Sequence, residues 1–126
     1  LPATSPPPPQ PRRRQYFAAH GVTAISVNYR SGVGYGRAFR LCEGCMSQGG
    51  AEYFDVRSAA RVLTGANASS PPLPAGLVPR GRGVGVGGIA YGGLNALQAS
   101  ARDSGLFAAG VSNAGIFVST STERLP

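Results

Sequence analysis

Residues 88–93, with the sequence GIAYGG, constrain the fold of this chain more than any other stretch. They follow the pattern G-x-S-x-G, except that Ala90 stands where the pattern has serine. The pattern forms a sharp turn between a strand and a helix, which lifts one side chain clear of the backbone. Glycines are needed because Cβ atoms would collide as the helix packs onto the sheet. Gly88, Gly92 and Gly93 therefore predict an intact turn in which position 90 lacks only an Oγ atom.

Three short runs read as strands. Residues 22–27 are β-branched and largely apolar, residues 83–88 alternate with glycine, and residues 107–112 form a third run. Helix-like stretches separate them, and connections of that length produce right-handed crossovers between parallel strands. The chain is therefore predicted to be α/β, with a mostly parallel sheet of about three strands and flanking helices.

The helices between these strands are predicted from apolar spacing. Over residues 50–63 one apolar stripe recurs with helical periodicity, formed by Tyr53, Val56, Ala60 and Leu63. The helix that follows residue 90 is expected to bury Leu94, Leu97 and Ala101. A shorter helix should end within residues 15–20, closed by Gly21, and the glycine-rich residues 31–36 should form a loop.

The first fourteen residues are of low complexity, with a proline-rich stretch followed by three arginines. Proline fixes φ and removes the N–H donor, so residues 1–14 are predicted to be extended or disordered. Residues 15–126 would then form the folded part. Because the sequence begins with Leu1, not Met, we expect it to be a fragment, the N-terminal part of a larger domain.

The chain carries a net charge of +7, supplied entirely by arginine. Basic chains can bind nucleic acid or anionic membranes. Outside residues 12–14 the arginines are scattered, so we expect neither partner, and a basic binding module led by this tail stays an alternative. No stretch has the apolar pattern of a signal peptide or the length of a membrane span, which leaves the compartment open with the cytoplasm favoured.

Cys42 and Cys45 form a single C-x-x-C pair. A structural zinc site needs four ligands, but the chain has no second cysteine pair and one histidine, His20. Glu43 between the cysteines disfavours the thiolate that a redox pair requires. We therefore expect two free thiols in a loop, and neither a metal nor a cofactor.

Several strings together resemble one protein family: Tyr16–Ala19, Val27–Gly32, Gly34–Arg37, Asp55-Val56, residues 88–93 and Leu106–Ser112. In this order they resemble the catalytic domain of the prolyl oligopeptidase family of serine peptidases, especially its dipeptidyl and acylaminoacyl peptidase branches. The resemblance covers about residues 15–118. It implies an α/β-hydrolase fold, a peptide or acyl substrate, and ancestry in peptide hydrolysis by attack of a serine on an acyl carbon.

Applied residue by residue, the resemblance places the family's serine at Ala90. The backbone N–H of Tyr91 would form half of the oxyanion hole. The family's acid and histidine follow the serine in the chain, and nothing suitable follows here, because Asp103 closes the next helix. His20 precedes the first predicted strand, whereas α/β active sites lie at the carboxyl ends of strands. We therefore expect a peptidase domain that is incomplete and inactive as written, a pseudoenzyme whose enzyme status stays open.

Two other functions stay open at this point. The chain could be a non-catalytic homologue that uses the same scaffold for binding. Alternatively, Gly83, Gly85 and Gly88 fit the G-x-G-x-x-G of a dinucleotide-binding fold, with Asp103 twenty residues after the first glycine. For the partial α/β fold itself, we expect an open sheet edge, and self-association through it.

Overall fold

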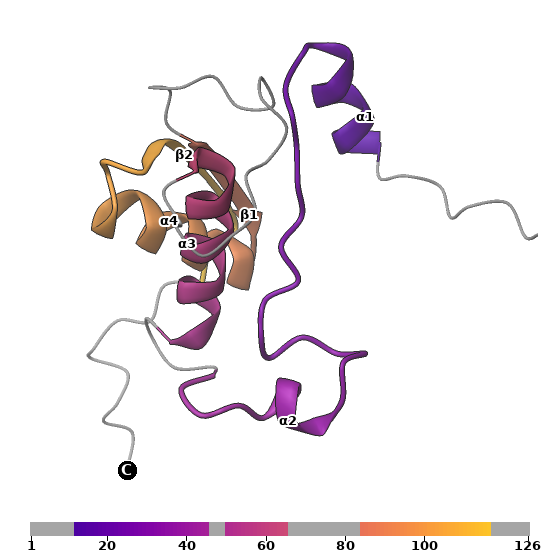
Figure 1. The fold of residues 1–126 in the computed structure, drawn as a ribbon, viewed down its shortest axis with the longest axis vertical. Coiled ribbons are helices and arrows are strands. Elements are labelled where there is room, and N and C mark those ends of the chain that lie inside the picture. Colours follow the sequence, from indigo (N-terminus) through magenta and orange to yellow (C-terminus); the bar gives the residue numbers. More distant parts are fainter. Residues whose placement is uncertain (1–11, 46–49, 66–83, 117–126) are drawn as a thin grey trace, which may run out of the picture.

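A computed structural model describes residues 12–45, 50–65 and 84–116. In chain order its elements are α1 (Arg12–Ala19), α2 (Arg37–Arg40), α3 (Ala51–Thr64), β1 (Val84–Ile89), α4 (Tyr91–Arg102) and β2 (Phe107–Asn113). The last four pack into one unit, whereas α1 and α2 lie at the two ends of a long segment that runs beside it (Figure 1). Within the described ranges, none of the helices has the length and apolar character needed to cross a membrane.

The sheet consists of β1 and β2, which pair in parallel. Gly85 lies opposite Ala109 and Ile89 opposite Asn113, with one irregularity between Val84 and Gly85. Helix α4 makes the crossover between the two strands. The α/β class, the parallel pairing and the flanking helices are therefore as predicted.

The prediction of a third strand at residues 22–27 is wrong, so the described sheet has two strands and not about three. This segment has no regular secondary structure, and no backbone hydrogen bond joins it to β1. It is fixed at its first residue, where the Val22 N–H donates to the Phe17 carbonyl over 2.9 Å, and again three residues after its end, where Arg30 pairs with Asp55 on α3. A β-branched sequence becomes a strand only where a partner edge pairs with it.

Two helices were placed well by the sequence. Helix α3 ends at Gly65, whose φ of 70° is left-handed and whose N–H donates to the carbonyls of Arg61 and Val62. Tyr53 and Ala60, from the predicted stripe, are buried. Helix α1 is followed by Gly21 at φ 71°, but it begins at Arg12, three residues inside the stretch predicted to be disordered. Residues 1–11 of that stretch lie outside the described ranges.

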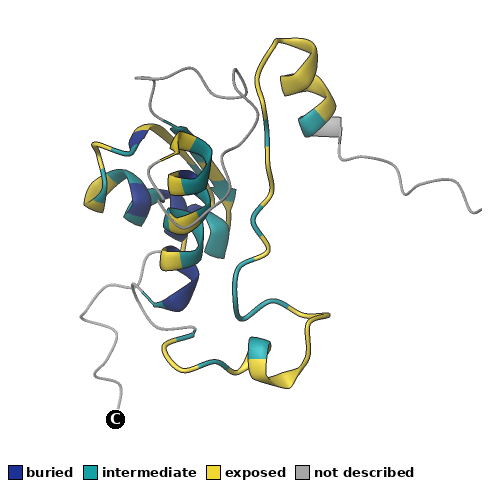
Figure 2. Cartoon of the chain, viewed as in Figure 1, coloured by how far each residue is buried: buried dark blue, intermediate teal, exposed yellow. Residues whose placement is uncertain are grey.

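The buried face of α4 differs from the prediction. Its buried residues are small or polar: Gly93, Asn95, Ala96 and Ala99. Figure 2 shows buried, intermediate and exposed stretches within the packed unit. Leu94 and Leu97 are half-buried and Ala101 is exposed, so the predicted face was wrong. The reason is how closely this helix approaches the strands: a Cβ atom built on Gly110 of β2 would overlap the Ser100 side chain. Small residues on the buried face of α4 permit this approach, and Leu94 and Leu97 lie at the half-buried sides of the helix.

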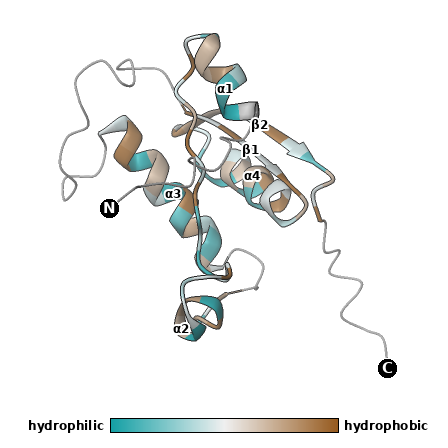
Figure 3. Cartoon of the chain, turned by 90° about the vertical axis from the view of Figure 1, so that its right-hand side faces the viewer, coloured by the Kyte–Doolittle hydropathy of each residue, from teal (hydrophilic) through white to brown (hydrophobic). Residues whose placement is uncertain are grey.

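The core is correspondingly small. Its buried members are Tyr53, Ala60, Ala99 and Phe107, with Val56, Val84, Val86 and Leu106 packed against them. Apolar side chains also lie at the surface, and Val111 on β2 is 68% exposed. Figure 3 shows hydrophobic residues along β2, although Val111 on this strand is exposed to solvent.

The assignment of the buried face of α4 can be tested by replacing one buried and one exposed alanine with a larger residue. Ala99 is fully buried, so Ala99→Leu should overpack the contact with the sheet and lower the free energy of unfolding by about 1–3 kcal/mol. The matched control is Ala101→Leu on the exposed side, which should change stability by less than about 0.5 kcal/mol. Urea denaturation followed by circular dichroism measures both. A larger loss for Ala101→Leu than for Ala99→Leu would contradict this packing.

Candidate active site

The turn at Ala90 has the predicted strained backbone. Ala90 adopts φ 53° and ψ −117° between the end of β1 and the first residue of α4. Its N–H donates to the Asn113 carbonyl over 3.0 Å, and its own carbonyl accepts the Leu94 N–H over 3.1 Å. The residue is exposed, so the turn presents position 90 to solvent.

Gly88 and Gly93 have the packing role that the sequence predicted, whereas a Cβ atom on Gly92 would meet nothing within 4 Å, so the collision predicted there is wrong. A Cβ atom on Gly88 would overlap the backbone carbonyl of Gly92, one turn into α4. A Cβ atom on Gly93 would lie 2.8 Å from the Cα of Gly115 and 2.8 Å from the Oγ of Ser112. Backbone therefore touches backbone on both sides of the turn, and no larger residue fits at either place.

Tyr91 is the first residue of α4, and its N–H belongs to the first turn of that helix. N–H groups there have no intrahelical acceptor, and no side chain caps this helix end. Aligned peptide dipoles add partial positive charge at the same place. The geometry thus suits an oxygen with developing negative charge beside position 90, which is where the resemblance puts an oxyanion donor. That role of Tyr91 stays a prediction.

Behind the turn lies a cluster that the sequence analysis missed. Glu52, in the first turn of α3, is completely buried, and the rings of Tyr29 and Tyr91 lie 6.3 Å apart. Burial raises the pKa of Tyr91, and the charge of Glu52, the nearby Tyr29 and a hydrogen bond with Glu52 raise it further. Burial and Glu52 likewise raise the pKa of Tyr29. Both phenols are therefore neutral at physiological pH. Glu52 and Tyr29 contact the Tyr91 side chain and fix its position.

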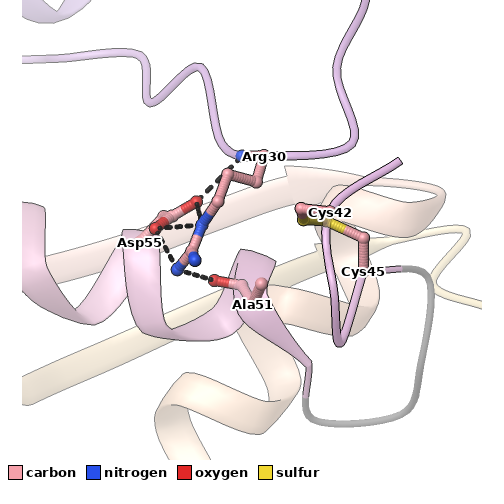
Figure 4. Close-up of a disulfide and its surroundings, with 5 residues drawn as sticks. All are labelled: Arg30, Cys42, Cys45, Ala51 and Asp55. Atoms are coloured by element: carbon pink, nitrogen blue, oxygen red, sulfur yellow. Dashed lines mark hydrogen bonds and ion pairs between the residues drawn. A yellow bond between two sulfur atoms is a disulfide. The ribbon is translucent and has the colours of Figure 1, made fainter. Parts of the chain in front are cut away.

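A charged pair ties the incoming segment to α3. The Arg30 Nε donates to both carboxylate oxygens of Asp55 over 3.0 Å, its Nη2 donates to Oδ1 over 2.8 Å, and its backbone N–H donates to Oδ2 over 2.8 Å. The same Nη2 reaches the Ala51 carbonyl over 3.3 Å (Figure 4). Burial of Asp55 opposes ionisation, but the hydrogen bonds and charge of Arg30 outweigh it and lower the pKa of the carboxyl group.

Next to this pair lies a disulfide between Cys42 and Cys45, where free thiols were expected (Figure 4). The expectation failed because residues 42–45 turn tightly and bring the two Cα atoms to 5.3 Å, within the usual range for a disulfide. The loop also contacts α3, since the Gly44 carbonyl accepts the Ala51 N–H over 2.9 Å. The disulfide therefore closes the loop whose Gly44 carbonyl contacts the start of α3.

Comparison with known protein families identifies this arrangement. The model of the prolyl oligopeptidase family matches residues 10–125, which is nearly the whole chain. The chain belongs to the prolyl oligopeptidase family. Its ancestry is thus that of a serine peptidase, and its two parallel strands with flanking helices are part of an α/β-hydrolase fold. Neither the curated proteins nor the solved structures contain a significant match to it.

Asp103 and His20 are of the residue types that a serine peptidase uses as acid and base, but here both contact other groups. Asp103 follows the last residue of α4, accepts a hydrogen bond from the Tyr53 hydroxyl and lies 3.0 Å from the Arg57 Nε. His20 follows α1, outside the packed unit, and its Nδ1 lies 2.9 Å from the Tyr16 carbonyl oxygen (Figure 1). Asp103 thus connects the end of α4 to α3. A dinucleotide-binding fold needs its ribose-binding acid at the end of a strand, whereas Asp103 comes before β2.

Potential metal ligands do not cluster within the described part of the chain. Within residues 12–45, 50–65 and 84–116, no three side chains of histidine, cysteine, aspartate or glutamate come together as potential ligands. At the turn itself, the structure shows the Tyr91 N–H in the first turn of α4 and an exposed methyl group at position 90.

The Arg30–Asp55 pair predicts acid sensitivity. Because pairing lowers the folded-state pKa of Asp55, the pair contributes fully above the unfolded-state pKa of about 4, and its contribution is lost as the pH falls through the folded-state value. Asp55→Asn should therefore lower the free energy of unfolding at pH 7 by about 1–3 kcal/mol. The deficit should shrink below pH about 4. Urea titrations across pH measure this.

The control for that experiment is Glu43→Gln, which removes the same formal charge from an exposed residue. It should change stability by less than about 0.5 kcal/mol at every pH. An Asp55→Asn deficit that is the same at pH 3 and pH 7 would contradict the assignment of the effect to the ionised carboxylate.

The contact between Gly88 and Gly92 gives a second test. Gly88→Ala places a methyl group against the Gly92 backbone and should cost about 1–3 kcal/mol of stability. Gly85→Ala, on the same strand, places its methyl group in open space and should cost less than about 0.5 kcal/mol. Thermal unfolding of the two variants compares them directly, and equal stabilities would mean that α4 does not close onto β1 as described.

Proposed function

We propose that this chain is a piece of a peptidase catalytic domain, a pseudoenzyme that retains the elbow of a serine peptidase and does not itself hydrolyse peptides or esters through a covalent intermediate. The single observation behind this proposal is Ala90. It stands exposed at the strained turn between β1 and α4, with a methyl group where the family's chemistry needs a hydroxyl oxygen.

The surroundings support the proposal. A serine attacks an acyl carbon only when a base accepts its proton, and the base needs a third group to orient it. The 126 residues contain one histidine, His20, whose Nδ1 already faces the Tyr16 carbonyl. Asp103 is engaged by Tyr53 and Arg57. Position 90 therefore has no nucleophilic oxygen, and both His20 and Asp103 are engaged by other groups.

The uncapped first turn of α4 supports a second candidate function, a non-catalytic scaffold for peptide or acyl ligands. The first-turn N–H groups of α4 remain uncapped by any side chain beside an exposed Ala90. A carbonyl oxygen of a ligand would accept a hydrogen bond there, next to a methyl group that cannot react with it.

Activity is tested on the 126-residue chain, on Ala90→Ser and on a matched control, Ala101→Ser, which adds an exposed serine elsewhere on α4. Each protein is incubated with a fluorophosphonate probe and with a chromogenic ester. All three should give labelling and turnover at the buffer level, because a serine without a base is a poor nucleophile at neutral pH. Labelling within residues 88–93 of the unaltered chain, or turnover by Ala90→Ser well above that of Ala101→Ser, would contradict the proposal.

A further inference from the structure

A pocket of about 550 Å³ lies where helix α2 meets the glycine-rich turn that precedes it. Helix α2 lies apart from the packed unit in both Figure 1 and Figure 3, and none of its residues is buried. Within the described ranges, the residues that line the pocket are Val33, Gly34, Gly36, Arg37, Arg40 and Leu41. All of them are exposed, so the pocket opens directly to solvent.

Two arginine side chains give this pocket its charge. Arg37 and Arg40 are three positions apart on α2, which places their side chains on the same side of a helical turn. Neither forms an ion pair with another residue in the described part of the chain, where the pairs are Arg30–Asp55 and one on α3. The pocket is therefore positively charged, and its guanidinium groups are available to a ligand.

The chain itself supplies few acids that could neutralise this charge. Of its five acidic residues, Glu52, Asp55 and Asp103 are engaged around α3 and α4. Residues 46–49, which follow the disulfide loop in the sequence, are all uncharged. With a net charge of +7, the chain attracts acidic partners and repels a second copy of itself.

Contacts within residues 28–39 hold the pocket in shape. The Asn28 Nδ2 donates to the Tyr35 hydroxyl over 2.6 Å, and the rings of Tyr35 and Phe39 lie 5.0 Å apart. The Ser31 N–H donates to the Phe39 carbonyl over 3.0 Å. Because this shape exists before a ligand arrives, less conformational entropy is lost on binding.

The lining indicates the kind of ligand. Val33 is 74% exposed and Leu41 is 63% exposed, beside the two guanidinium groups. Small-molecule sites enclose most of their ligand, which a pocket with exposed walls does not do. Nucleic-acid interfaces are more polar and more positively charged, whereas protein interfaces combine arginine with apolar side chains. This lining therefore favours a polypeptide that carries carboxylates next to an apolar side chain.

We propose that this pocket binds an acidic segment of a separate polypeptide. Carboxylates of the segment pair with Arg37 and Arg40, because the planar N–H fork of a guanidinium group matches the two oxygens of a carboxylate. An apolar side chain of the same segment covers Val33 and Leu41. The pocket belongs to the segment before α3, so this interaction goes beyond the function proposed for the turn at Ala90.

The probe is a fluorescein-labelled, capped hexapeptide of alternating glutamate and leucine. Its binding to the 126-residue chain is followed by fluorescence anisotropy at a salt concentration of about 0.1 M. One matched peptide has glutamine in place of glutamate, and a second has serine in place of leucine. On the protein, Arg37→Gln and Arg40→Gln each remove one guanidinium group. The matched control, Arg61→Gln, removes the same charge from an exposed arginine in the last turn of α3.

We expect saturable binding of the acidic peptide, weakened about threefold to tenfold by Arg37→Gln and by Arg40→Gln. Arg61→Gln should bind within about twofold of the unaltered chain, because salt screens a charge at the far end of α3. The glutamine peptide should bind about tenfold more weakly, and the serine peptide about threefold more weakly. Circular dichroism establishes that each variant is folded, and the matched peptides test the unaltered chain even if a variant does not fold.

Four results would overturn this inference. A lack of saturable binding, or equal binding of the glutamate and glutamine peptides, would mean that the pocket does not recognise carboxylates. A loss for Arg61→Gln as large as that for Arg37→Gln would mean attraction by net charge without a site. A short DNA duplex that binds more tightly than the peptide, and loses affinity with Arg37→Gln, would make nucleic acid the occupant. Because no hydrolysis is measured, failure here is distinguishable from failure of the activity test.

Discussion

The contact between the backbones of Gly88 and Gly92 is the constraint on which the rest of this structure depends. It brings the first turn of α4 against the end of β1 so closely that no Cβ atom fits between them. The intervening residue, Ala90, must then adopt φ 53°, a conformation that costs about 1–3 kcal/mol for a non-glycine residue. The same geometry lets the Ala90 N–H reach the Asn113 carbonyl, so the turn and the parallel pairing of β1 with β2 support each other.

Long-range polar contacts then assemble the surroundings of the turn. Of the four acidic residues that the structure describes, three lie in such contacts: Glu52, Asp55 and Asp103. Asp55 fixes Arg30 and with it the end of the segment that carries Tyr29, Glu52 supports Tyr91, and Asp103 joins the end of α4 to Tyr53 and Arg57. Because the apolar core is small, these contacts hold helix α3 and the incoming segment in place around the elbow.

Features encoded within a few residues could be predicted from the sequence, and features that depend on distant partners could not. The glycines at 88 and 93 specify the turn locally, and Tyr53 and Ala60 of the periodic apolar residues specify the buried face of α3. The segment 22–27 has the composition of a strand, but pairing depends on where Arg30 anchors it. The buried face of α4 was mistaken because close approach to a sheet favours alanine over leucine. The sequence around Glu52 indicates only an acidic residue in the first turn of a helix. Its burial could not be predicted, because it depends on Tyr29 and Tyr91, which are distant in the sequence.

The family assignment and the structure together describe an elbow that is kept while its nucleophile is absent. The most direct test of this claim is the backbone conformation of position 90 in solution, measured by NMR as the intraresidue NOE between the amide proton and Hα. A residue at positive φ holds these two protons close together, so Ala90 should give a much stronger NOE than Ala96, which lies within α4. An NOE at Ala90 as weak as that at Ala96 would mean that position 90 is ordinary helix or strand, and would contradict the account.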